Sequence, residues 1–115
     1  MGDFQVKTIR KARKPHRCCE CHGLIVPGQS YEHVAGVWDG GADRFKTCMH
    51  CVEAREWAIA QKEWSWDGEH LFCFEALGES LAGLAPEIYP GDGRRFRAYR
   101  LRCEMQNRRR TSVQH

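Results

Sequence analysis

The chain has 115 residues, of which 42% are hydrophobic, and its net charge is +3. This length suits one domain with a modest core, so a metal ion or another crosslink would add stability that the core lacks. No run approaches the roughly 20 apolar residues that span a bilayer, and the basic start of the chain lacks the apolar stretch of a secretory signal. We therefore expect a cytoplasmic protein with no membrane partner.

Charge is divided unevenly along the chain. Residues 1–17 carry six basic groups and one acidic group, and residues 94–115 carry eight arginines and one glutamate. Between them, residues 18–93 carry thirteen acidic groups and four basic groups. Basic ends therefore flank an acidic body, a pattern that predicts either an anionic partner or charge pairing within the chain.

The first part of the chain predicts strands and turns. Phe4, Val6 and Ile9 indicate strand character, and Pro15 argues against a helix that runs into the first cysteines. Gly23 is available for a positive φ in the turn CCECHG.

A hairpin is predicted next. Residues 30–38 alternate as a strand does, Asp39-Gly40-Gly41 is a hairpin turn, and residues 44–47 return as a second strand that ends at Cys48. Trp38, beside the turn, is expected in the core, with a contact role at the loop tip as the alternative.

The hydrophobic period changes after Cys51. Residues 51–64 lack Gly and Pro and are rich in helix-forming residues, which predicts a helix. Apolar residues recur at steps of three and four over residues 70–84, so a second helix is predicted there, ended by Pro86. Residues 95–110 fit a strand or a helix, and we favour a basic helix with a frayed end.

Two C-x2-C pairs carry the clearest chemistry. Cys18 and Cys21 are separated from Cys48 and Cys51 by 26 residues, and the predicted hairpin can return the second pair to the first. Zinc favours four ligands in a tetrahedron, and thiolates are common among them. We therefore predict one structural Zn²⁺ held by these four cysteines, with an iron–sulfur cluster as the alternative. Four thiolates leave no open position for water, which argues against catalysis.

Other residues near the two pairs compete for the ligand role. They are Cys19, His16, His22 and His50. Because four thiolates are available, we expect these residues to lie outside the metal shell. A second metal site that joins His70, Cys73 and Cys103 is disfavoured, because Cys73 lies in an apolar run where cysteine acts as a small hydrophobic residue.

The order of turn, hairpin and helix resembles the treble-clef zinc finger, in which a knuckle supplies two ligands and a helix start supplies two more. The resemblance covers Cys18 to about Glu63. The basic lead-in, residues 25–28, Tyr31, the VWDG turn and the TCMHC stretch also resemble short zinc-finger proteins encoded by bacteriophages and prophages. This second resemblance implies a phage or prophage setting more than an activity, although small phage proteins commonly bind host proteins or nucleic acid. The arginine-rich C-terminus lies outside it.

Treble-clef scaffolds also occur in HNH-type nucleases, which need a catalytic histidine beside a metal-binding residue on the hairpin and a further His or Asn on the helix. Here His33, preceded by Glu32, is the only hairpin histidine, and the segment after Cys51 offers neither His nor Asn. A phosphate-binding glycine loop and a nucleophile with a base partner are also missing. We therefore expect no enzymatic activity.

These observations predict an α+β chain in four parts: a basic segment 1–17, a treble-clef-like module 18–63, a helix and loop 64–93 packed on it, and an arginine-rich segment 94–115. The first functional hypothesis is binding of DNA or RNA through the basic ends. The residues predicted to do so are Arg10, Lys11, Arg13, Lys14, Arg94, Arg95, Arg97 and Arg100. The alternative is a phage-type interaction module, an inhibitor or adaptor of a host protein complex.

Overall fold

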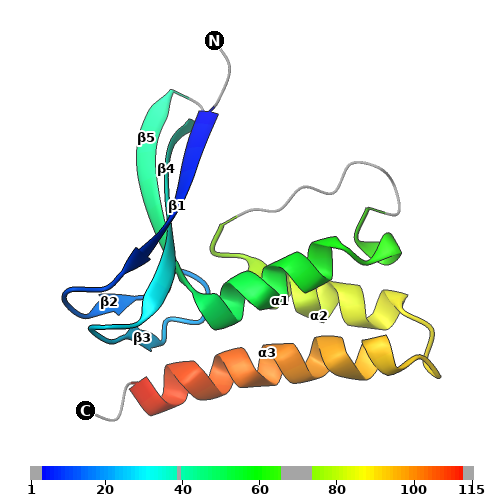
Figure 1. Ribbon diagram of the computed structural model, residues 1–115. Coiled ribbons are helices and arrows are strands. Elements are labelled where there is room, and N and C mark those ends of the chain that lie inside the picture. The colour runs from blue at the N-terminus through cyan, green and yellow to red at the C-terminus, as the bar shows by residue number, and fades with distance from the viewer. Residues whose placement is uncertain (1–3, 39, 66–73, 113–115) are drawn as a thin grey trace.

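The computed structural model describes residues 4–38, 40–65 and 74–112. Within them the chain is an α+β protein in which an antiparallel sheet projects from a layer of helices (Figure 1). The elements in chain order are β1 (Phe4–Lys11), β2 (His16–Arg17), β3 (Leu24–Ile25), β4 (Ser30–Trp38), β5 (Gly41–Cys48), α1 (Met49–Ile59), the 3-10 helix η1 (Lys62–Ser65), α2 (Leu77–Glu87) and α3 (Gly93–Ser112).

The larger sheet has the strand order β1-β4-β5, and all its pairings are antiparallel. The predicted hairpin is confirmed as β4 and β5, although β5 begins at Gly41, three residues earlier than expected. Gly40 supplies the positive φ of 80° that the tight turn requires, and Asp39 lies outside the described residues. The strand character of the N-terminal segment is confirmed as β1, whose residues are all exposed.

A second, two-stranded sheet of β2 and β3 encloses the first cysteine pair. The positive φ in this turn falls at His22, at 60°, and the prediction for Gly23 is wrong. A glycine is needed at position 23 because a side chain there would crowd the neighbouring atoms. A Cβ atom there would lie 3.2 Å from Cys21 Sγ and 3.2 Å from Arg108 Cβ, so the missing side chain lets α3 approach the turn.

Helix α1 begins at Met49 and ends at Ile59, so the predicted helix over residues 51–64 is too long at its C-terminal end. The chain continues there as η1, in which Trp64 is buried. Ala54 and Ala58 form the buried face of α1, and their small side chains allow the helix to lie close to its neighbours.

Helix α2 begins at Leu77, and the predicted start at His70 falls outside the described residues. The prediction is wrong for residues 74–76, which form a turn with a positive φ of 73° at Glu75. Pro86 lies inside the last turn of α2, which ends at Glu87. A proline so near the end removes one intrahelical hydrogen bond but does not stop the helix earlier.

The C-terminal segment is a helix, as favoured over a strand, and α3 packs along α2. The core between the helices and the small sheet is formed by buried apolar side chains. They include Ile25, Leu77, Leu81, Leu84, Ile88 and Met105. Among the aromatic residues expected in the core, Tyr31 and Trp64 are buried, Trp38 and Trp57 are partly exposed, and Trp66 lies outside the described residues.

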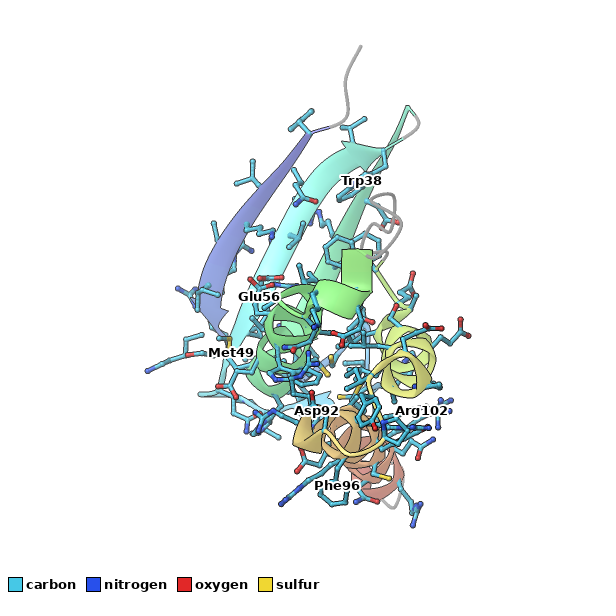
Figure 2. The ribbon with its side chains drawn as sticks, turned by 90° about the vertical axis from the view of Figure 1, so that its right-hand side faces the viewer. Trp38, Met49, Glu56, Asp92, Phe96 and Arg102 are labelled. Carbon is cyan, nitrogen blue, oxygen red and sulfur yellow. The ribbon has the colours of Figure 1, made fainter. Side chains whose placement is uncertain are left out.

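The two basic ends of the chain approach one another at one side of the molecule. β1 ends near the small sheet, and α3 ends beside the same sheet (Figure 1). Figure 2 places Trp38 near the tip of the sheet and Phe96 on the far side of the molecule, on α3. Among the described residues, no helix has both the length and the apolar character to cross a membrane.

Candidate metal centre and basic surface

The four predicted cysteines lie together where the sheet meets the helices. Cys18 and Cys21 come from the turn between β2 and β3, Cys48 ends β5, and Cys51 lies in the first turn of α1. Their Sγ atoms all lie within 4.8 Å of one another. The hairpin therefore returns the second pair to the first, and the cluster can hold one metal ion.

The sulfur spacing suits tetrahedral coordination. A Zn–S distance of about 2.3 Å in a regular tetrahedron separates neighbouring sulfurs by about 3.8 Å. Cys21 Sγ and Cys48 Sγ are 3.8 Å apart. A single ion of this size therefore fits the cluster with only small movements of the other sulfurs.

Backbone N–H groups are directed at the sulfurs. Glu20 N–H and Cys48 N–H each donate to Cys18 Sγ at 3.4 Å, and Gly23 N–H donates to Cys21 Sγ at 3.3 Å. These donors stabilise negative charge on sulfur more than they stabilise a neutral thiol. The arrangement therefore suits thiolates, the form of cysteine that binds metals.

The second cysteine pair lies at the start of a helix. Cys48 immediately precedes α1, and Cys51 lies in its first turn, where the helix dipole favours negative charge. The hydrogen bond with Cys18 is the main cause that lowers the pKa of Cys48 to about 7. The same cluster raises the pKa values of Cys18 and Cys51, so the hydrogen bonds among the four thiols favour charge on some sulfurs at the expense of others.

The competing ligands take other positions. Cys19 Sγ lies 3.4 Å from Thr47 Oγ1, and burial raises the pKa of this thiol to about 12. The histidines that were weighed as substitutes also lie outside the cluster found among the described residues; they are His16, His22 and His50. Of the disfavoured second site, Cys103 is exposed on α3, and His70 and Cys73 lie outside the described residues.

Glu20, which lies inside the first C-x2-C turn, connects the cluster to α2. Its carboxylate accepts hydrogen bonds from Glu75 N–H at 2.9 Å and from Leu77 N–H at 3.0 Å. The N-cap residue of α2, Ala76, makes no side-chain capping bond of its own. A carboxylate from the metal-binding turn therefore caps this helix. The sequence analysis missed this role, although an acidic residue inside a C-x2-C turn is a visible feature.

Arg108 connects the cluster to α3. Its Nη2 donates to Cys51 Sγ at 3.3 Å, and its Cβ lies against the space left by Gly23. Four thiolates around a divalent ion carry a net charge of −2, so a guanidinium beside one sulfur opposes that charge. The Arg108 guanidinium is thus engaged by the cysteine cluster and is not available to an external anion through that contact.

The first group of predicted nucleic-acid-binding residues lines a hollow of about 1090 Å³ on the outer face of the large sheet, which we call the basic concavity. Its cations are Arg10, Lys11, Arg13, Lys14, Arg44 and Lys46, and its rings belong to His16, Tyr31 and His33. The pairings Ala35↔Arg44 and His33↔Lys46 place the two β5 cations on the same face as His33. Sequence analysis missed Arg44 and Lys46, because only the strand register shows that they face β1's Arg10.

No acidic residue in the described part of the chain lines the basic concavity. Among the described residues, no ion pair joins its six cations to a carboxylate. Its positive charge is therefore available to an anionic ligand.

The second predicted group lies in the first half of α3, away from the basic concavity. Arg94 is ion-paired with Glu63 at 2.8 Å and with Asp92 at 2.8 Å. The Arg97 guanidinium lies 5.7 Å from the ring centroid of Trp57. Arg100 Nε is 3.5 Å from the carboxylate of Glu104. None of the described residues that line the basic concavity belongs to α3, so the two predicted groups do not share this hollow.

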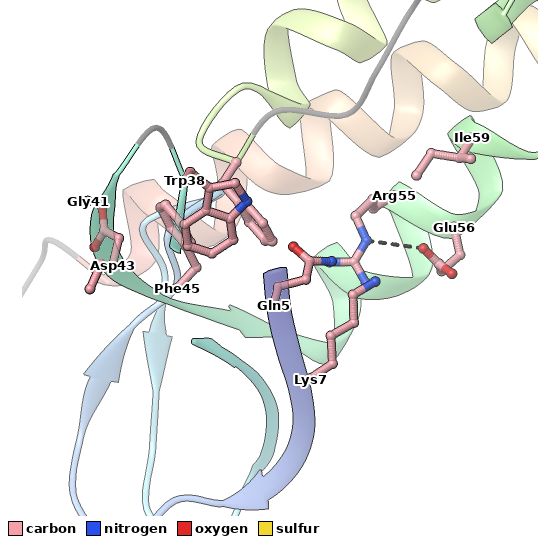
Figure 3. A pocket seen from close by; sticks show the side chains of 11 residues that line it. Gln5, Lys7, Trp38, Gly41, Asp43, Phe45, Arg55, Glu56 and Ile59 are labelled. Carbon is pink, nitrogen blue, oxygen red and sulfur yellow. Dashed lines mark hydrogen bonds and ion pairs between the residues drawn. The ribbon is translucent and has the colours of Figure 1, made fainter. Parts of the chain in front are cut away.

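The inner face of the sheet bears a different cavity, of about 540 Å³, between the strands and α1 (Figure 3). Trp38, Phe45 and Phe74 form its aromatic wall, with the two phenyl rings stacked at 4.3 Å. Its buried Arg55 binds Glu32 through two hydrogen bonds of 2.7 Å and also contacts Glu56. The guanidinium of this cavity is thus already paired within the chain.

No family model, curated protein or solved structure matches the chain. What the chain does must therefore be inferred from its own residues.

Proposed function

We propose that this chain is a structural-zinc module in which Cys18, Cys21, Cys48 and Cys51 bind one Zn²⁺. The support is the four-sulfur cluster itself, its 3.8 Å sulfur spacing and its backbone donors. Native mass spectrometry of the protein, with and without a chelator, tests this directly. One zinc per chain is the expected result, and iron or no metal at all would contradict it.

The order of a two-cysteine turn, a hairpin and a helix that begins beside the second pair supports a treble-clef type of finger. The phage-encoded setting rests on the sequence resemblance alone. The module is proposed to be non-enzymatic. Four thiolates leave no position for a substrate or water. Glu32 and His33 are adjacent on β4 and therefore point to opposite faces of the sheet, so they cannot act on one metal ion.

The function we propose is binding of nucleic acid through its phosphate backbone. The observation that carries this proposal is the basic concavity, which gathers six cations and, among the described residues, no carboxylate. Cations that neutralise phosphates release counterions, so affinity must fall steeply with salt. The basic side of α3's C-terminal end, which lies toward the small sheet, would extend this surface.

Fluorescence anisotropy with labelled DNA and RNA duplexes and single strands tests the proposal. If about four phosphates are contacted, the affinity should fall roughly a hundredfold between 50 and 200 mM salt. Absence of binding at low salt would contradict nucleic-acid binding without affecting the zinc assignment.

A second candidate function is docking on a protein, as the interaction-module alternative predicts. The outer face of the sheet near its tip exposes Phe4 and Val6, which are 61% and 56% exposed and lie beside Val37 and Ala35 in the strand register. A host-lysate pull-down that survives nuclease treatment, and that is lost in Phe4→Ser with Val6→Ser, would favour this function over the first.

A further inference from the structure

His33 lies at the floor of the basic concavity, in the middle strand of the sheet. Only 6% of the residue is exposed, and its side chain lines the hollow. Its neighbour across β5 is Lys46, and its neighbour across β1 is Thr8, whose hydroxyl donates to the His33 carbonyl at 3.5 Å. The imidazole is therefore held in place by the strand backbone rather than by a flexible loop.

The His33 imidazole makes no hydrogen bond to another described residue, and its ring nitrogens are open to the hollow rather than closed off from it. A ring nitrogen in this position can donate to a molecule that enters the hollow. Arg10 on β1 and Arg44 and Lys46 on β5 line the same hollow. An acceptor from outside the chain would therefore meet His33 and these three cations together.

We propose that His33, Arg10, Arg44 and Lys46 form a binding site for a phosphate group. A phosphate supplies several acceptor oxygens and a negative charge, and guanidinium and ammonium groups are its usual partners in proteins. His33 donates from the floor while the three cations enclose the anion from β1 and β5. The proposal rests on the proposed function, because it assigns the phosphate of a bound nucleic-acid strand to this position.

The charges of the site predict a proton linkage. Burial, followed by the fields of Arg10, Lys46 and Arg44, lowers the pKa of His33. The His33 ring is therefore neutral at pH 7 when no anion is bound. An anion in the site opposes the surrounding positive charge and raises the pKa of His33, so binding takes up a proton and strengthens as the pH falls.

The experiment follows the His33 imidazole by NMR while inorganic phosphate, pyrophosphate, a DNA duplex or an RNA single strand is added to the zinc-loaded protein at pH 6 and pH 8. We expect saturable shifts of the His33 ring and tighter binding at pH 6. The variants are His33→Gln and Lys46→Gln, and Lys7→Gln is the matched control, because Lys7 carries the same charge on β1 but faces the other side of the sheet. Loss of one charge-assisted contact should weaken oligonucleotide binding about tenfold in Lys46→Gln.

The outcomes separate the site from the function. Binding of oligonucleotide that is weakened equally in Lys46→Gln and Lys7→Gln, with no shift of His33, would overturn the phosphate site and leave general nucleic-acid binding intact. A His33 shift with phosphate or pyrophosphate but not with either oligonucleotide would support the site and contradict nucleic acid as its ligand. Near-ultraviolet circular dichroism and zinc content check that each variant is folded.

Discussion

The arginines of α3 and the cations of the sheet's outer face look alike in the sequence but differ in the structure. Arg94, Arg97 and Arg100 contact Glu63, Trp57 and Glu104 respectively, and Arg108 contacts Cys51. The cations of the basic concavity have no such anionic partners among the described residues. A cluster of positive charge in the sequence thus predicts an anionic ligand only where its cations have no anionic partner within the chain.

This difference separates two roles for positive charge. On α3, Arg94, Arg97 and Arg108 attach the helix to the rest of the domain and to the cysteine cluster, whereas the Arg100–Glu104 pair lies within the helix. On the sheet, the cations raise the local electrostatic potential and have no carboxylate partner among the described residues. Substitutions of Arg94, Arg97 or Arg108 should therefore change stability, and substitutions of the sheet cations should change binding.

The largest expected effect comes from the cysteine cluster. In Cys18→Ser or Cys51→Ser, or on chelation, the domain should unfold, because structural zinc contributes about 10–16 kcal/mol and a domain of this size has about 5–15 kcal/mol of total stability. Far-ultraviolet circular dichroism would detect the loss. Cys103→Ser on the exposed face of α3 is the control and should behave like the native protein. A cooperative unfolding transition that persists unchanged in Cys51→Ser would contradict a structural metal.

The buried ion pair on the inner face should come next. Glu32→Ala leaves the Arg55 guanidinium buried without its two-bond partner and should cost about 3–5 kcal/mol. The hydrogen bond with Arg55 lowers the pKa of Glu32, so the stability from this pair is present above the ordinary glutamate pKa and is lost as the pH falls below it. Urea unfolding at pH 7 and pH 3.5 measures this, and a native-like midpoint in Glu32→Ala would contradict it.

The capping carboxylate should have a smaller and more local effect. Glu20→Ala removes the acceptor for Glu75 N–H and Leu77 N–H and should cost about 1–2 kcal/mol. Hydrogen exchange should quicken at the start of α2 and stay unchanged in β4. The conservative variant Glu20→Gln keeps one acceptor oxygen, so its hydrogen exchange at the start of α2 should lie between that of the native protein and that of Glu20→Ala. Equal exchange in all three proteins would argue that α2 needs no cap from the metal-binding turn.

A pair of charge removals tests the comparison itself. Arg94→Gln should lower the melting temperature slightly and leave oligonucleotide affinity unchanged, because its guanidinium is already held by Glu63 and Asp92. Lys46→Gln should leave the melting temperature unchanged and weaken oligonucleotide binding. The hydrogen bond with Arg94 lowers the pKa of Glu63, so the stabilising effect of Arg94 should disappear as the pH falls through the acidic range. A loss of affinity in Arg94→Gln as large as in Lys46→Gln would mean that α3 binds the ligand too.

The smallest expected effect is on the pH dependence of the free protein. The lowered pKa values of His16 and His33 mean that the unfolded chain takes up protons first as the pH falls below about 6.5. Stability should therefore decline modestly between pH 7 and pH 5.5, and pyrophosphate should restore it. Differential scanning calorimetry at a few pH values measures the decline. A melting temperature that is the same at pH 5.5 with and without pyrophosphate would argue against an anion at His33.

Short-range chemistry made the cysteine cluster, the hairpin and the basic C-terminal helix predictable. C-x2-C spacing, a glycine turn and an uninterrupted helical segment each act over a few residues. The start of α2 was not predictable in this way, because its cap comes from Glu20, 57 residues before Leu77. The role of Arg44 and Lys46 depends on strand register across β1, β4 and β5, and the pairing of Arg94 with Glu63 depends on how α3 docks. Distances in sequence contain neither piece of information.

The distant cap of α2 also bears on the order of folding. The β4–β5 hairpin and α1 form from neighbours in the chain and can assemble early, whereas α2 gains its cap only after a loop of more than fifty residues has closed. We therefore expect the metal-binding turn to be in place before α2 is secured, so that zinc supply would set the rate at which newly made chains complete their helical layer. A chain synthesised under zinc starvation would expose the apolar side of α2 and would be open to degradation by quality-control proteases.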